Sequence, residues 1–103
     1  CEYEKKNWEV LHLSDNDYLS IQKKLGKEIK IARLKKEVTI LELSQISGIG
    51  DSYLSRLENG RLTSPSLKTY LKVCYALNLN PASFFATASE SPPFNADDYN
   101  YID

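Results

Sequence analysis

The chain has 103 residues, of which 42% are hydrophobic, and a formal net charge of −1. This length allows one small domain with flanking segments and a modest core. No apolar run approaches the roughly 20 residues of a membrane helix, and the first residues do not form a basic leader followed by an apolar segment. We therefore expect a soluble, cytoplasmic protein without a membrane partner.

The two cysteines and the single histidine do not have the spacing of a metal site. Cys1 and Cys74 are far apart, and His12 is isolated in sequence from both. Cys74 falls on an apolar stripe and is expected to be a small buried core residue. No Ser or Cys has a plausible catalytic base beside it in sequence, and no Gly-rich phosphate loop occurs. We expect no metal, no cofactor, no disulfide framework and no enzymatic activity.

Positive and negative charges are segregated along the chain. Residues 1–18 contain two Lys and five acidic residues, a net charge of −3. Residues 19–86 contain eleven Lys and Arg and five acidic residues, a net charge of +6, whereas residues 87–103 contain four acidic residues and no basic one. A basic domain is the expected electrostatic footprint of a polyanion-binding protein, and acidic tails can compete for the same surface.

Residues 1–17 show no clear period and are predicted to form an acidic N-terminal arm. Apolar residues then recur at helical spacing, which predicts a helix over about 18–36 with one buried stripe: Ile21, Leu25, Ile29 and Ala32. Its N-cap is expected among Asp15, Asn16 and Asp17. Lysines occupy the remaining faces of this helix: Lys23, Lys24, Lys27, Lys30, Lys35 and Lys36.

Two short helices joined by a tight turn are predicted over residues 39–60. Thr39 and Glu42 have the spacing of a capping box, which starts the first helix at about residue 40. Val38 and Leu43 stand at the positions of a hydrophobic staple. This spacing fixes where the first helix of the pair begins.

The second helix of the pair is predicted to run from Ser52 to about Glu58. Gly48 can adopt the left-handed conformation that ends the first helix, and the Asp51 carboxylate is expected to cap the second. Leu54 and Leu57 share one face, and polar residues occupy the others: Ser52, Ser55, Arg56 and Asn59. Two short helices at this spacing form a helix-turn-helix unit.

A fourth helix is predicted to follow the Gly- and Pro-containing loop 59–65. Ser64 is expected to be its N-cap, with Pro65 and Ser66 in the first turn. Its predicted stripe consists of Leu67, Leu71, Cys74 and Leu77, with Tyr70 and Val73 alongside.

Asn80 and Pro81 are expected to be the N-cap and first residue of a short last helix, whose Phe84 and Phe85 would close the core. From residue 87 the composition becomes acidic and Pro-containing, which predicts a flexible C-terminal tail over 87–103. The compact domain is thus expected to cover residues 18–86. The aromatic residues of the tail are expected to dock either on the domain or on a protein partner: Phe94, Tyr99 and Tyr101.

The segment LSQISGI followed by SYLSRLENG resembles the Cro/C1-type (XRE) family of DNA-binding repressors. The resemblance extends from about Leu25 to Phe85, because SLKTYLKVCYALNLNPASFF is similar to the fourth and fifth helices of that family. It implies an all-α, five-helix, lambda-repressor-like domain with the helix-turn-helix at helices 2 and 3. It also implies a buried ion pair between Arg33 of the first helix and Glu58 at the end of the third.

By the same resemblance, the first turn of the third helix (about 51–59) points into the major groove of double-stranded DNA. Arg56 is expected to contact guanine O6 and N7. Ile40 stands where the family commonly has a polar residue that touches phosphate, and Asp51 stands where Arg, Lys or Gln is frequent. The residues implied to lie at the DNA are Thr39, Ile40, Asp51, Ser52, Tyr53, Ser55, Arg56, Asn59, Arg61 and Thr63.

These features favour a sequence-specific, double-stranded DNA-binding transcriptional regulator, expected to be a repressor and to act as a homodimer on a pseudo-palindromic operator. The alternative is a protein-interaction module of the same fold, antitoxin-like or a coactivator, that binds DNA weakly. Ile40, Asp51 and the aromatic acidic tail motivate this alternative.

Overall fold

The computed structural model describes residues 13–95, which form an all-α domain. Residues 1–12 of the arm predicted over 1–17, with Cys1 and His12, lie outside the described residues, as does the end of the predicted tail, with Tyr99 and Tyr101. The helices are α1 (Asp15–Lys35), α2 (Ile40–Ser47), α3 (Asp51–Glu58), α4 (Leu67–Leu77) and α5 (Pro81–Ser89). The predicted five-helix order is confirmed, with the helix-turn-helix pair at α2 and α3.

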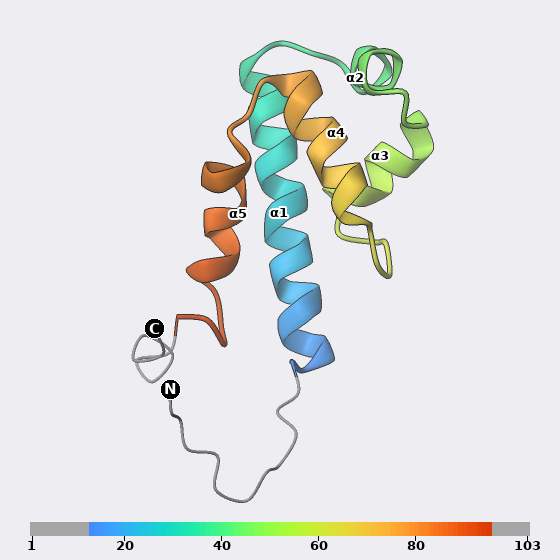
Figure 1. The fold of residues 1–103 in the computed structure, drawn as a ribbon. Coiled ribbons are helices and arrows are strands. Elements are labelled where there is room, and N and C mark those ends of the chain that lie inside the picture. Colours follow the sequence, from blue (N-terminus) through green and yellow to red (C-terminus); the bar gives the residue numbers. More distant parts are fainter. Residues whose placement is uncertain (1–12, 96–103) are drawn as a thin grey trace, which may run out of the picture.

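The long helix α1 is the axis of the domain. Figure 1 shows α5 along one side of α1, and α2, α3 and α4 on the other. Helix α1 packs against α3, α4 and α5, whereas α2 packs against α3 and α4. The helix-turn-helix pair is therefore supported by α1 and α4 rather than standing free.

One hydrophobic core joins all five helices. The stripe predicted for α1 is confirmed, because Ile21, Leu25 and Ile29 are buried and Ala32 packs against them. Cys74 is buried and free, and burial raises the pKa of its thiol. The other helices contribute Leu43, Leu54, Leu57, Tyr70, Val73, Leu77 and Phe84. Phe85 is only partly buried and packs against this core.

The stripe predicted for α4 was wrong at two of its four positions. Leu67 is 63% exposed and Leu71 is 41% exposed, whereas Tyr70 and Val73 are buried. Apolar residues follow helical spacing on two adjacent faces of α4, so periodicity alone does not decide which face packs. The packing of α4 against α1 and α2 selects the face with Tyr70 and Val73.

The predicted starts of α1 and α4 were also wrong. Helix α1 begins at Asp15 after Ser14, whose hydroxyl oxygen accepts a hydrogen bond from the Asp17 backbone N–H at 3.0 Å. Helix α4 is capped by Ser66 rather than by Ser64, and the Ser66 hydroxyl lies 3.1 Å from the Thr69 backbone nitrogen. Several residues in each stretch have side chains that can cap a helix, and the path of the chain selects one of them.

The C-terminal end of the domain lies beyond the predicted boundary at residue 86. Asn80 caps α5 and Pro81 is its first residue, as predicted, but the helix continues to Ser89. Ser91 is then buried; its hydroxyl donates to the Thr87 carbonyl at 2.8 Å and lies 3.2 Å from Nζ of Lys24. Ala, Thr and Ser at 86–89 are compatible with a helix, so regular structure does not stop where the composition changes.

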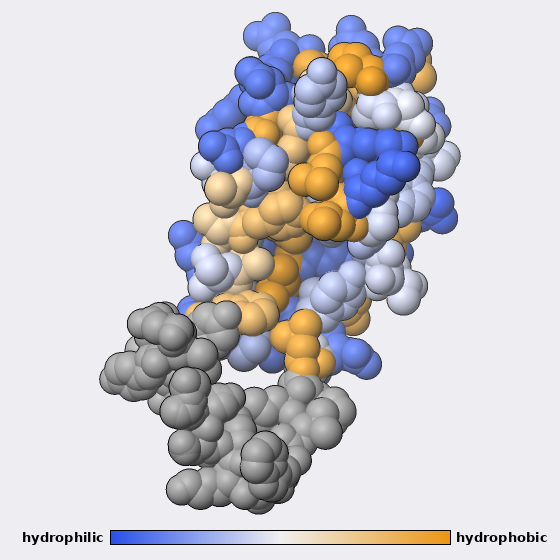
Figure 2. Space-filling view, in the orientation of Figure 1, coloured by the Kyte–Doolittle hydropathy of each residue, from blue (hydrophilic) through white to orange (hydrophobic). Residues whose placement is uncertain are grey.

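Figure 2 shows hydrophobic side chains gathered over α1, α4 and α5 on one face of the domain, with hydrophilic side chains around them. Exposed large apolar residues include Ile31 of α1 and Tyr75 of α4. Within residues 13–95, no helix has both the length and the hydrophobicity that crossing a membrane requires.

Candidate nucleic-acid interface

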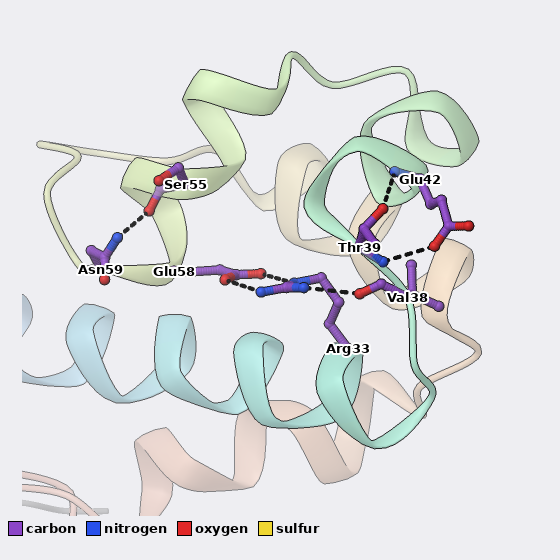
Figure 3. Close-up of polar contacts among 7 residues, drawn as sticks. All are labelled: Arg33, Val38, Thr39, Glu42, Ser55, Glu58 and Asn59. Atoms are coloured by element: carbon purple, nitrogen blue, oxygen red, sulfur yellow. Dashed lines mark hydrogen bonds and ion pairs between the residues drawn. The ribbon is translucent and has the colours of Figure 1, made fainter.

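The start of α2 is fixed by the predicted capping box (Figure 3). The Thr39 hydroxyl accepts from the Glu42 backbone N–H at 3.0 Å, and the Glu42 carboxylate accepts from the Thr39 backbone N–H at 2.8 Å. Gly48 ends the helix in the left-handed conformation, with φ at 75°. The N-terminus of α2, where helix dipoles favour anions, is thereby held in one position.

Asp51 does not cap α3. The N-cap is Gly50, and Asp51 is the first residue of the helix. The Gly50 carbonyl already accepts the first helical hydrogen bond, from the Leu54 backbone N–H at 2.9 Å. The Asp51 carboxylate instead accepts from the adjacent Ser52 backbone N–H at 2.8 Å. The carboxylate therefore satisfies one backbone N–H at the start of the helix, although Asp51 belongs to the helix and does not precede it.

Helix α3 has a buried face and an exposed face. Leu54 and Leu57 are completely buried, as predicted. Ser52, Ser55 and Arg56 are exposed, and Tyr53 is half-buried. The Arg56 guanidinium lies 6.0 Å from the centroid of the Tyr53 ring, at the outer limit of a cation–π contact. The exposed face therefore presents two hydroxyls and one cation with few internal contacts.

The turn after α3 places three further predicted residues beside this face. Asn59 follows the helix, and its side-chain amide donates to the Ser55 carbonyl at 2.8 Å (Figure 3). Gly60 takes a positive φ of 67°, and the Arg61 backbone N–H donates to the Arg56 carbonyl at 2.9 Å. Arg61 and Thr63 are exposed. Ile40, at the start of α2, is half-buried and packs against the core.

A buried ion pair orients α3 on α1, at the positions expected from the resemblance. Arg33 Nε lies 2.7 Å from Glu58 Oε2, and Arg33 Nη2 lies 3.1 Å from Oε1. The Arg33 Nη1 group also donates to the Val38 carbonyl at 2.8 Å, as Figure 3 shows. One guanidinium thus joins α1, the end of α3 and the linker that leads to α2.

Two residues of α1 that support this surface were not identified from the sequence. A Cβ at Gly26 would lie 2.2 Å from the Leu57 carbonyl oxygen and 2.9 Å from that of Glu58, so α1 and α3 approach too closely for a side chain. Gln22 is buried, and its amide donates to the Leu62 carbonyl in the loop after α3. A glycine inside an otherwise regular helical pattern was the available signal for this close approach.

Comparisons with known proteins agree with the five-helix fold. The sequence pattern of the helix-turn-helix family matches residues 29–84, more than half of the chain. Two solved structures of the clp gene regulator ClgR from Corynebacterium glutamicum are similar, with TM-scores of 0.62 and 0.63 and sequence identities of 34% and 31%. They match 69% and 79% of this chain, and 90% and 85% of the solved chains.

Two curated relatives match parts of the same region. The ImmF control region 10 kDa protein of Bacillus phage phi105 is 40% identical over 58 residues, 56% of this chain and 63% of that protein. The HTH-type transcriptional regulator SlrR of Bacillus subtilis is 34% identical over 61 residues, 59% of this chain and 40% of that protein. The chain thus spans less than two thirds of either relative. From the family match and the five-helix fold together, the chain belongs to the Cro/C1-type helix-turn-helix family.

Proposed function

We propose that the chain is a sequence-specific, double-stranded DNA-binding transcriptional regulator that reads the major groove with α3. The observation that carries the proposal is the division of α3 into a fully buried face and an exposed polar face that includes Arg56. An α-helix fits the major groove, where each base pair presents a distinct pattern of donors and acceptors. SlrR and ClgR are both described as regulators, which supports the same function.

Base recognition is assigned to the exposed face of α3. Arg56 can donate to O6 and N7 of one guanine, a contact that is specific for that base. Ser52 and Ser55 can donate to or accept from neighbouring base edges or phosphates. Asp51 is assigned to the helix start, because its carboxylate already accepts the Ser52 N–H at 2.8 Å.

Contacts to the sugar-phosphate backbone are assigned to the two ends of the helix-turn-helix unit. At one end, Thr39 and Ile40 would act through the N-terminus of α2, where backbone N–H groups favour an anion. At the other end, the turn after α3 carries Asn59, Arg61 and Thr63. Such contacts position a protein on DNA without specifying sequence.

The regulator is proposed to act as a homodimer and a repressor. Two-fold pairing would double the DNA contacts of a domain this small and set two half-sites about one helical turn apart. The exposed apolar residues of the face in Figure 2 support an interface between two copies, since such patches mark interaction sites.

Selection of binding sites from a random double-stranded DNA pool tests this function, with Arg56→Ala selected in parallel. The proposal predicts a two-fold symmetric motif for the natural chain and a weaker or relaxed motif for the variant. Enrichment of a single half-site without two-fold symmetry would contradict the proposed homodimer but not DNA recognition. No enrichment by folded protein would contradict DNA recognition and favour the interaction-module alternative, with a protein partner for the acidic C-terminal segment.

A further inference from the structure

Helix α1 carries a row of lysines beside the proposed DNA-reading unit. The lysine row (Lys23, Lys27 and Lys30) lines one hollow of about 380 Å³ together with Glu58 and Asn59 from the end of α3. All three lysines are exposed. The row is therefore next to the turn to which the proposed function assigns backbone contacts.

Two contacts fix α1 against that turn. A Cβ added at Gly60 would lie 3.0 Å from Cα of Lys23 and 3.1 Å from its Cβ and Cγ, so the base of the Lys23 side chain lies directly against the turn. The neighbouring Gln22 donates to the Leu62 carbonyl in the same loop. The position of the row relative to Asn59 and Arg61 is thus set by packing and not by the lysine side chains alone.

The charge of the row is uncompensated within the described part of the chain. Over residues 13–95, no carboxylate lies within ion-pair distance of Lys23, Lys27 or Lys30. Glu58 is the acidic residue that lines the hollow, and both of its oxygens are engaged by Arg33. An anion in the hollow would therefore meet three free ammonium groups and one neutralised carboxylate.

We propose that the lysine row is a further DNA-backbone contact surface, which extends the footprint of the helix-turn-helix unit along one strand. The inference rests on the proposed function. At about 1.5 Å of rise per residue the row spans roughly 10 Å of helix axis. One DNA strand presents a phosphate about every 3.4 Å along its axis, so the row matches a series of phosphates rather than a single anion.

Two lysines of the row lie before the residues that the family pattern matches. The family match begins at Ile29, so Lys23 and Lys27 precede it, as do Gln22 and Gly26. Helix α1 begins fourteen residues before the match, at Asp15. The part of α1 before Ile29 thus both holds the loop after α3 and places positive charge beside it.

A matched pair of double variants tests the row. The test variant, Lys23→Gln/Lys27→Gln, removes two charges from the row. The control variant, Lys24→Gln/Lys35→Gln, removes two charges from another flank of α1. On that flank Lys24 contacts Ser91, and Lys35 lines a separate hollow with Leu79. Glutamine keeps the Cβ and Cγ that pack near Gly60. Duplex affinity is measured against salt concentration for the selected site and for an unrelated duplex.

The row variant should reduce the slope of log K against log salt by about 1 to 2, since each phosphate contact contributes about 0.9. The reduction should be the same on both duplexes, the selected motif should not change, and the control variant should keep the natural slope. Equal slopes for the two variants would overturn the lysine row. If the slopes are equal but Arg56→Ala still relaxes the selected motif, the lysine row fails and the proposed function stands. If the natural chain selects no motif, the proposed function fails. The slope on the unrelated duplex still tests the lysine row in that case.

Discussion

The two faces of α3 are built from the same eight residues but are held in different ways. The buried face is fixed by Leu54 and Leu57 in the core and by the Glu58 ion pair to α1. The exposed face, with Ser52, Ser55 and Arg56, has few contacts of its own and depends on the buried face for its position. The difference teaches that stability and recognition can be separated within one short helix, and substitutions on each face should separate them experimentally.

The largest effect is expected on the buried face, from Glu58→Ala. The variant leaves the guanidinium of Arg33, a residue that is 7% exposed, without its carboxylate. Loss of one partner of a buried pair costs about 3 to 5 kcal/mol of unfolding free energy, which denaturant titration measures. The double variant Arg33→Met/Glu58→Leu should recover much of this loss, because it removes both charges. A loss below about 1 kcal/mol for Glu58→Ala would show that the pair does not hold α3.

Gly26→Ala is expected to be the next largest perturbation. The new Cβ would lie 2.2 Å from the Leu57 carbonyl oxygen, and backbone rather than a flexible side chain must move. Overpacking of this kind costs about 1 to 3 kcal/mol, or more. Gly50→Ala is the matched control, because a Cβ there meets nothing within 4 Å; its cost should stay below about 1 kcal/mol. Equal unfolding free energies for the two variants would contradict the close approach of α1 and α3.

Thr39→Ala should have a smaller effect, of about 0.5 to 2 kcal/mol, because the Glu42 backbone N–H loses its hydroxyl acceptor. Thr39→Ser keeps the hydroxyl and should be nearly neutral. Thermal unfolding of both variants measures the difference. If Thr39→Ser and Thr39→Ala lower the unfolding temperature equally, the loss of stability comes from the methyl group of Thr39 and not from the hydroxyl that caps α2.

The helix-turn-helix unit could be predicted from the sequence because its signals are local. The capping box of Thr39 and Glu42, and Gly48 as the end of α2, depend on residues within a few positions of each other. Where several adjacent residues offer the same local signal, the sequence did not decide between them. Ser64 and Ser66 are both able to cap α4, and Asp51 follows Gly50 directly, so tertiary packing made the choice.

Apart from the Arg33–Glu58 ion pair, which the resemblance implied, the contribution of α1 to the site could not be predicted, since it depends on contacts between distant residues. Nothing local to Gln22 indicates that its amide reaches Leu62, 40 positions away. The two apolar faces of α4 are a second example, because both satisfy helical periodicity. The period of apolar residues predicts that a helix packs against others. The neighbouring helices determine which of its faces is buried.

Arg56→Ala should have the smallest effect on stability, within about 0.5 kcal/mol, because the side chain is exposed. On the same protein, the ratio of affinity for the selected site to affinity for an unrelated duplex, at one salt concentration, measures recognition. We predict a fall in this ratio of about 5- to 150-fold, the loss of one bidentate guanine contact. An unchanged ratio, or a variant that unfolds, would contradict the separation of recognition from stability on the two faces of α3.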